Sequence, residues 1–334
     1  MSKHRIEWLD NAKGVAIFLV VLGHVLRGLP EGSGKGESWA VFVDAWIYTF
    51  HMPVFFLLSG LFIESAAAKP FGEFLDGKLR TIMYPYFVWS VLQELVRSTT
   101  GAADLSEIWR IIYQPVMQYW FLYVLFLLGV AFAVLRKARM PVWGFGVFVA
   151  VLYVLPQFGV NLGSWGVVYM AALNGIYFAA GALDGPVRLP ARFEGRRPLP
   201  LIVFAAAVFL LLGGAVAAGV QGSGWLKPLL GLLGTAATLA LSNALFRLGL
   251  CRFFLGWGRL SLEIFVAHTI FSAGVREVLL RLHCTSAAIH VAAGLVAGMV
   301  GPLVLVTVLR HLNIRWAFSL PAPRRAAADG ISPR

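Results

Sequence analysis

The sequence predicts an all-α polytopic membrane protein, with its helices arranged around a polar central cavity. Hydrophobic residues make up 59% of the 334 positions and charged residues only 13%, whereas soluble globular chains hold about 45–50% and 25%. The mean hydropathy is +0.78, and the apolar residues come in blocks of roughly 17–25, long enough to cross a hydrocarbon core of about 30 Å. This composition excludes a soluble enzyme, a disordered chain and a disulfide scaffold. It also excludes a β-barrel, whose strands would alternate over about ten residues.

About ten membrane spans follow one another along the chain, and the third and fifth are the shortest. Gly, Pro and Ser punctuate the connecting segments, as at residues 30–34 and 184–186. We expect a single transmembrane domain over residues 1–320, followed by a short, basic, disordered cytoplasmic tail over residues 321–334. The spans are predicted at residues 13–29, 41–63, 82–96, 119–135, 142–156, 165–183, 199–220, 226–246, 260–279 and 287–309.

The basic residues predict the orientation of these spans. With the N-terminus in the cytoplasm, 21 of the 28 Lys and Arg residues fall on the cytoplasmic side. This bias is the positive-inside rule, and it places both termini in the cytoplasm. The same rule explains the net charge of +12, because basic residues collect in the cytoplasmic loops of a protein in a lipid bilayer. We therefore expect no nucleic-acid partner. The seven exceptions are Arg27, Lys35, Arg97, Arg110, Lys227, Arg276 and Arg281.

The first predicted span carries two ionisable side chains on one face. Lys13 and His24 are eleven positions apart, which on a regular helix leaves them about 20° from alignment and roughly 16 Å apart. An ionisable group at membrane depth costs at least about 2.5–3.5 kcal/mol, so it indicates a functional site. We therefore expect a cation at the cytoplasmic mouth and an imidazole just beyond the middle of the membrane.

Two further spans place imidazoles at a similar depth. His51 lies in the second span, two residues before Pro53, which we expect to kink the helix. The ninth span carries Glu263 and His268. Because these two are five positions apart, about 140° around a helix, both cannot face one cavity unless the helix is distorted. The common depth of His24, His51 and His268 nevertheless predicts a single polar cavity.

Structural explanations compete with a functional one for each of these residues. An intramembrane His can simply be a hydrogen-bond partner between helices, Lys13 can be a snorkelling anchor, and Glu263 can pair with Arg259 one turn earlier. Three His could also bind zinc. No two of them lie at ligand spacing on one helix, so we expect no metal.

Four segments, in this order, resemble motifs of the acyltransferase-3 family of integral membrane acyltransferases. Residues 8–24 (WLDNAKGVAIFLVVLGH) are similar to its opening helix, with a basic residue, ten intervening positions and a His. Residues 50–60 (FHMPVFFLLSG) resemble the second-helix block of fucose 4-O-acetylase-like members. Residues 78–86 (KLRTIMYPY) are similar to a basic pair ahead of the third helix, here with Lys at the first position. Residues 261–268 (SLEIFVAH) resemble a late segment with an acidic residue and a His.

This resemblance implies a multi-pass acyltransferase of the inner or plasma membrane. The acyl donor would be cytoplasmic acyl-CoA, most simply acetyl-CoA, and the acceptor a hydroxyl of a carbohydrate or glycolipid. Lys13, Lys78 and Arg80 would hold the phosphates of coenzyme A. His24 would act as a general base or carry the acyl group itself. Glu263 would orient or charge-balance an imidazole, and His51 or His268 would donate to the oxyanion.

Two other classes of protein remain as alternatives at this stage. A secondary transporter would also place His and Glu at the middle of the membrane, but it would move a substrate without consuming acyl-CoA. It is also expected to have paired Gly and Pro breaks in its helices, a pattern that the sequence lacks. A structural or sensory membrane subunit would tolerate substitution of His24 and Glu263.

Overall fold

The computed structural model describes residues 6–33, 35–314 and 316–321, and every regular element in them is helical. The α-helices are α1 (Glu7–Arg27), α2 (Ser38–Gly60), α3 (Ile63–Ala67), α4 (Phe71–Lys78), α5 (Tyr84–Ser98), α6 (Trp120–Lys137), α7 (Val142–Val154), α8 (Gly166–Ala191), α9 (Pro198–Ala217), α10 (Lys227–Arg247), α11 (Phe253–Arg259), α12 (Ser261–Arg281) and α13 (Ala287–His311). A π-helix, η1 (Leu79–Met83), joins α4 to α5. Short 3-10 segments are η2 (Leu105–Ile112), η3 (Met117–Tyr119), η4 (Leu155–Phe158) and η5 (Val220–Gly222).

Each predicted span overlaps one of these helices, which confirms a polytopic helical membrane protein. Within the described residues, seven helical segments are long and apolar enough to cross a membrane. The number of crossings, ten, and the cytoplasmic position of both termini stay predictions. The seven segments are Glu7–Arg27, Ser38–Gly60, Leu105–Lys137, Gly166–Ala191, Pro198–Ala217, Lys227–Arg247 and Ala287–His311.

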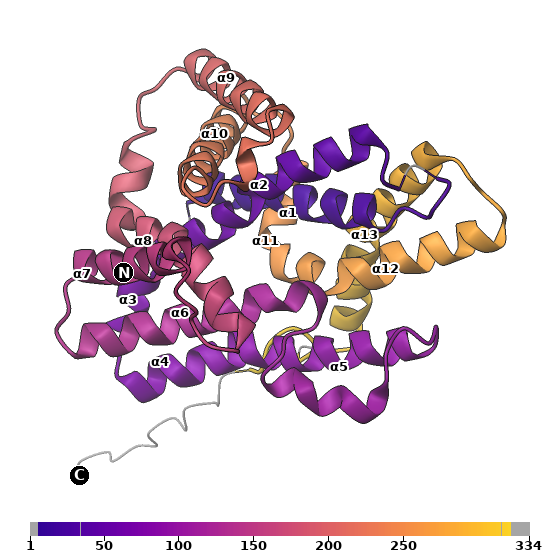
Figure 1. Ribbon diagram of the computed structural model, residues 1–334, viewed down its shortest axis with the longest axis horizontal. Coiled ribbons are helices and arrows are strands. Elements are labelled where there is room, and N and C mark those ends of the chain that lie inside the picture. The colour runs from indigo at the N-terminus through magenta and orange to yellow at the C-terminus, as the bar shows by residue number, and fades with distance from the viewer. Residues whose placement is uncertain (1–5, 34, 315, 322–334) are drawn as a thin grey trace, which may run out of the picture.

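Helix α1 lies at the centre of the bundle and is the most buried of the seven candidate spans. It packs against α2, α10, α11, α12 and α13. The pair α9 and α10 lies on one side of α1 and α2, and α4, α5 and α6 lie on the other (Figure 1). The central position of α1 brings its polar side chains beside those of several other helices.

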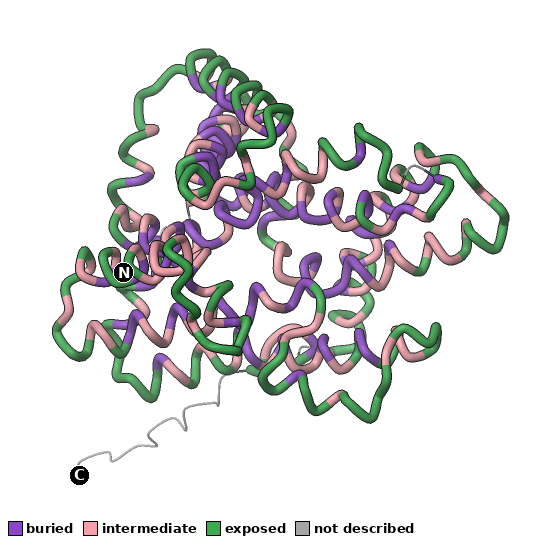
Figure 2. Tube along the Cα trace, in the orientation of Figure 1, coloured by how far each residue is buried: buried purple, intermediate pink, exposed green. Residues whose placement is uncertain are grey.

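Apolar side chains on the outer helices face away from the bundle. Figure 2 shows α9 mostly exposed while α1 and α2 are buried along much of their length. On α9, Leu199 and Leu210 are 69% and 77% exposed. Such an apolar exterior fits a hydrocarbon solvent, because lipid tails are as apolar as these side chains.

Glycines allow two pairs of helices to approach closely. A Cβ atom on Gly258 of α11 would overlap the backbone carbonyl of Asp10 on α1, and one on Gly181 of α8 would overlap the carbonyl of Leu57 on α2. Small residues at such contacts are typical of membrane helices, because close van der Waals packing drives their association. The contact with α11 fixes the N-terminal half of α1, which carries Lys13.

One helix agrees with its predicted span, and two others extend beyond theirs. Helix α2 continues through Pro53 to Gly60, as the span over residues 41–63 predicts, and the kink at Pro53 stays a prediction. Helix α8 includes a break at Gly185, whose φ of +68° is left-handed, where the sequence predicts a loop. The chain from Phe71 to Ser98 is helical throughout, because η1 joins α4 to α5 through one π-turn.

The chain after α13 returns to the start of α5. The Trp89 indole Nε1 donates to the carbonyl of Ala317 at 2.9 Å, and its ring stacks on Phe318. Of the predicted disordered tail over residues 321–334, only Pro321 lies within the described residues, and its carbonyl accepts a hydrogen bond from Arg80.

Candidate active site

His24 on α1 and His268 on α12 form a pair of imidazoles inside the bundle. Their ring centroids are 5.1 Å apart, with an interplanar angle of 59°. His268 is fully buried, and its Nδ1 lies 2.8 Å from the carbonyl oxygen of Phe265 and 3.0 Å from that of Ile264. Since a carbonyl oxygen only accepts, Nδ1 carries the proton of the neutral ring. The lone pair is therefore on Nε2, which is buried and has no hydrogen-bond partner among the described residues.

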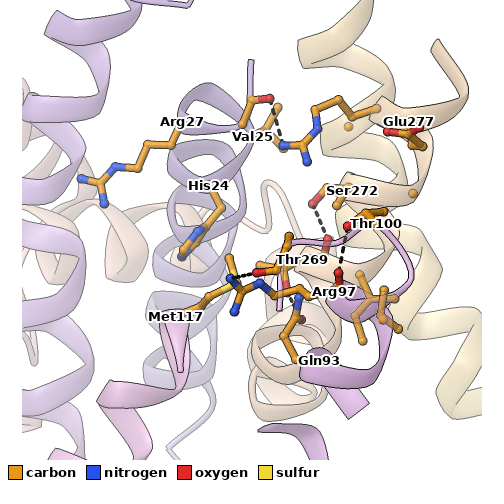
Figure 3. A pocket seen from close by; sticks show the side chains of 18 of the residues that line it. His24, Val25, Arg27, Gln93, Arg97, Thr100, Met117, Thr269, Ser272 and Glu277 are labelled. Atoms are coloured by element: carbon orange, nitrogen blue, oxygen red, sulfur yellow. Dashed lines mark hydrogen bonds between the residues drawn. The ribbon is translucent and has the colours of Figure 1, made fainter. Parts of the chain in front are cut away.

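His24 is less enclosed than His268, because it lines a cavity of about 880 Å³. We call this space the outer cavity, because it lies at the end of the bundle predicted to be extracytoplasmic. Figure 3 shows His24 on α1, with Thr269 and Ser272 on α12 and Gln93 on α5 across the pocket. His24 can therefore contact a molecule in the outer cavity, whereas His268 can act on it only through His24.

His51 lies one side chain behind this cavity. Its Nδ1 is 2.8 Å from the carbonyl oxygen of Ile47, one turn earlier on α2, and the side chain is buried. Its ring packs edge-on against Tyr48 at 4.5 Å between centroids, and Tyr48 lines the outer cavity. The structure thus places His51 near the predicted cluster but gives it no part of the cavity wall.

A second, smaller pocket of about 290 Å³ lies on the side of the imidazole pair that is predicted to be cytoplasmic. We call it the inner pocket; Lys13, Ser59, Thr81 and Ser261 supply its polar lining. The Lys13 ammonium is 3.5 Å from the carboxylate of Asp10.

Aromatic side chains close the end of the inner pocket nearest the imidazoles. Phe121 and Phe265, whose ring centroids are 5.3 Å apart, both line it. Phe265 in turn lies 6.2 Å from the His268 ring. On α12, Phe265 thus lines the inner pocket and Thr269 the outer cavity, with the fully buried His268 between them.

Lys78 and Arg80 lie beside the inner pocket but do not line it. Their neighbour Thr81 is part of its wall. Arg80 donates from Nε to both oxygens of Asp76 at 2.8 Å and from Nη1 to the carbonyl of Pro321 at 2.9 Å. Burial lowers the pKa of the Lys78 ammonium, and no carboxylate in the described part of the chain lies within ion-pair distance of it. Its nitrogen lies 5.7 Å from the centre of the Phe74 ring.

Glu263 faces away from the imidazole pair. Helix α12 is continuous and regular from Ser261 onward, so the angular separation of Glu263 and His268 holds. Glu263 interacts electrostatically with Arg310 on α13. The alternative pairing with Arg259 is wrong, because that guanidinium binds Glu7 at 2.7 Å.

The structure adds a hydrogen-bonded network that the sequence reasoning missed. The Gln118 amide donates to the Thr269 hydroxyl at 2.8 Å, and this hydroxyl donates to the Gln93 carbonyl oxygen at 2.9 Å. All three residues line the outer cavity, as does the buried His290 of α13. Two amide side chains near span ends were the available sequence signal, but only the fold joins them to Thr269. Within the described residues, no three His, Cys, Asp or Glu side chains gather closely enough to hold a metal ion.

The fold and this site define a polytopic helical membrane protein in which one imidazole lines a cavity and packs against a second, buried imidazole. The chain belongs to the acyltransferase-3 family, because the acyltransferase domain of that family matches residues 6–307. The resemblance of its four motifs to that family is confirmed.

Two relatives are similar to part of the chain. The nodulation protein NolL of Mesorhizobium japonicum is 28% identical over 145 residues, which cover 40% of this chain and 37% of the relative. NolL of Sinorhizobium fredii is 30% identical over 145 residues, which cover 40% of this chain and 38% of the relative. The matched stretch therefore spans less than half of either relative. No solved structure matches the chain significantly.

Proposed function

We propose that this protein is an acyltransferase that moves an acyl group, most simply acetyl, from cytoplasmic acetyl-CoA to a hydroxyl of a carbohydrate or glycolipid acceptor. The observation that supports this most directly is the position of the imidazole pair. His24 lines the outer cavity, and His268 packs behind the His24 ring. Lys13, on the same helix as His24, lines the inner pocket. Two reactants that approach from opposite sides of the membrane would meet at such a pair.

The inner pocket is the proposed donor side. Lys13 stands in its wall, and Lys78 and Arg80 lie beside it on one continuous helix. Ammonium and guanidinium groups bind phosphate through charge-assisted hydrogen bonds. Arg80 keeps its Nη2 group without a partner among the described residues, which leaves it able to donate to a phosphate of coenzyme A. The thioester end would then pass Phe121 and Phe265 to reach His24.

His24 is the proposed general base. It removes the proton from the acceptor hydroxyl while the hydroxyl oxygen attacks the thioester carbonyl carbon. The tetrahedral intermediate then collapses and breaks the carbon–sulfur bond, and the coenzyme A thiolate takes the proton back from the imidazolium. The products are an acyl ester and coenzyme A thiol, so atoms and charge balance. His268 is the proposed positioning residue, because its ring centroid lies 5.1 Å from that of His24 and its Nε2 has no hydrogen-bond partner among the described residues.

The hydrogen bonds of His268 and His51 oppose the oxyanion role expected from the sequence. In each neutral ring the single N–H is on Nδ1 and is directed at a backbone carbonyl. Neither ring therefore has an N–H left for an oxyanion. Gln118 is the better candidate, since its amide has a second N–H besides the one given to Thr269.

The test is acyl transfer by purified protein in proteoliposomes, with labelled acetyl-CoA, and mass spectrometry of cell-surface glycans from cells that carry each variant. His24→Gln should lower transfer at least about 100-fold, as expected for loss of a general base, with an unchanged unfolding temperature. His311→Gln is the matched control, because that imidazole is exposed at the end of α13. Transfer by His24→Gln at the rate of the control would refute the catalytic role.

A further inference from the structure

Arginines gather in the outer cavity against the topological bias of the chain. The sequence places seven Lys and Arg residues on the extracytoplasmic side, and four of them line this one cavity: Arg27, Arg97, Arg276 and Arg281. Figure 3 shows Arg27 and Arg97 at the pocket, together with Glu277. Glu277 is the single carboxylate among the described lining residues. Since the positive-inside rule disfavours cations here, each arginine needs a local reason.

Three of the four arginines have such a reason in their own helices. Each lies in the last turn of a helix, where a cation stabilises the negative end of the helix dipole. Each is also neutralised by a carboxylate. The pairs are Arg27–Asp44 at 2.9 Å, Arg97–Glu94 at 2.6 Å and Arg281–Glu277 at 3.4 Å.

Arg276 has neither of these reasons. It lies five residues before the end of α12, and no carboxylate among the described residues forms an ion pair with it. Its Nη1 donates to the carbonyl of Gly28 at 3.0 Å. A Cβ on Gly28 would lie 2.8 Å from that same nitrogen, so the missing side chain makes room for the guanidinium. Arg276 thus uses one of its five N–H donors to hold the guanidinium in place. The half-buried guanidinium has no carboxylate partner among the described residues.

Arg276 is aligned with the proposed catalytic pair. His268, Ser272 and Arg276 are four residues apart on α12, so they share one face, and Arg276 is about 12 Å beyond His268 along the helix axis. Ser272 and Arg276 both line the cavity that His24 lines. A ligand held at Arg276 can therefore extend along this wall toward the imidazole.

We propose that the outer cavity binds an acidic saccharide, whose carboxylate or phosphate pairs with Arg276 and whose hydroxyl reaches His24. The guanidinium matches either anion with two parallel N–H donors. The identity of this ligand as the acyl acceptor rests on the proposed function, whereas the binding of the anion does not. A neutral saccharide would leave the cation unpaired and bind more weakly.

Binding is measured with the purified full chain in nanodiscs, without acyl donor, by titration calorimetry. The probes are a glucuronosyl-glucose disaccharide, the corresponding glucosyl-glucose, and the same neutral disaccharide phosphorylated at its terminal 6-hydroxyl. We expect at least one acidic probe to bind about tenfold or more tightly than the neutral one, as for a hydrogen-bonded charge. The two acidic probes distinguish carboxylate from phosphate.

Three variants test whether the preference for acidic over neutral probes depends on Arg276. Arg276→Gln should abolish it, and Gly28→Ala should weaken it by displacing the guanidinium while leaving the arginine in the chain. Arg110→Gln is the matched control: this outer arginine pairs with Glu107 and is not part of the cavity wall, so the preference should be unchanged. Thermal unfolding of each variant checks that it is folded.

The proposal fails if neither acidic probe, titrated up to millimolar concentration, binds more tightly than the neutral one. It also fails if Arg276→Gln keeps the preference for acidic probes. An anion preference without acyl transfer would refute the proposed function and leave the anion site standing. Equal transfer to acidic and neutral acceptors would leave the proposed function standing and refute the acidic saccharide as the preferred acceptor.

Discussion

The close contact between α11 and α1 predicts that one added methyl group separates the two helices. Gly258→Ala would place a methyl group inside the backbone carbonyl of Asp10 and 2.9 Å from the backbone nitrogen of Gly14. Backbone atoms cannot rotate out of the way as a side chain would, so the two helices must separate. Gly256→Ala, two residues earlier on the same helix, is the matched control, because nothing lies within 4 Å of its added Cβ.

The size of the effect follows from this overlap. Inserting a methyl into a packed contact costs about 1–3 kcal/mol, whereas a Gly to Ala change in an open helical position gains roughly 0.5–1 kcal/mol. The two variants should therefore differ in unfolding free energy by about 1.5–4 kcal/mol. A displacement of about 1 Å in α1 also moves Lys13 and His24, and such a shift costs on the order of 100-fold in rate.

The assay is thermal unfolding of the two variants in the same detergent, followed by acyl transfer in proteoliposomes. We expect Gly258→Ala to unfold at a lower temperature than the wild-type protein and to lose most transfer. The control should unfold at or slightly above the wild-type temperature and keep its transfer. An unfolding temperature for Gly258→Ala equal to that of the control would show that α1 and α11 do not approach as closely as described.

Two other substitutions test the polar groups. Thr269→Val removes the hydroxyl between two buried glutamines, so it should destabilise the protein by about 1–3 kcal/mol for each group left unpaired; the exposed Thr307→Val is its control, and equal unfolding temperatures would contradict the network. Lys78→Met should raise the unfolding temperature at pH 7 and raise the KM for acetyl-CoA. Because burial lowers the pKa of Lys78 in the folded state, the unfolded chain binds more protons between the two pKa values, and the stability of the wild-type protein rises with pH there. The gain from methionine should therefore shrink at alkaline pH in unfolding scans, and a loss at pH 7 would contradict the buried charge.

The candidate site was only partly predictable from the sequence. Lys13 and His24 lie on one helix, so regular helix geometry alone predicts their relative positions. In the structure Lys13 lines the inner pocket and His24 lines the outer cavity. The conflict between Glu263 and His268 was also visible from their spacing. Which of the two faces α1 depends on how α12 is rotated against its neighbours, and that rotation is set by packing.

The long-range contacts required the tertiary structure. Nothing in the chain order predicts that His268 contacts His24, that Gln93 and Gln118 meet at Thr269, or that Arg276 reaches the carbonyl of Gly28. The three hydrogen bonds among these contacts join residues 151, 176 and 248 positions apart, and no periodicity links such residues.

By itself the sequence determined that the chain is a helical membrane protein, where its helices lie, and which ionisable side chains enter the apolar region. Those properties depend on hydropathy and on the fixed geometry of a helix, both of which are local. The tertiary structure decided that two pockets flank the imidazole pair and that the outer arginines converge on one of them. That outcome depends on the rotation and close approach of helices far apart in the chain, which are set by the shapes of the packed surfaces.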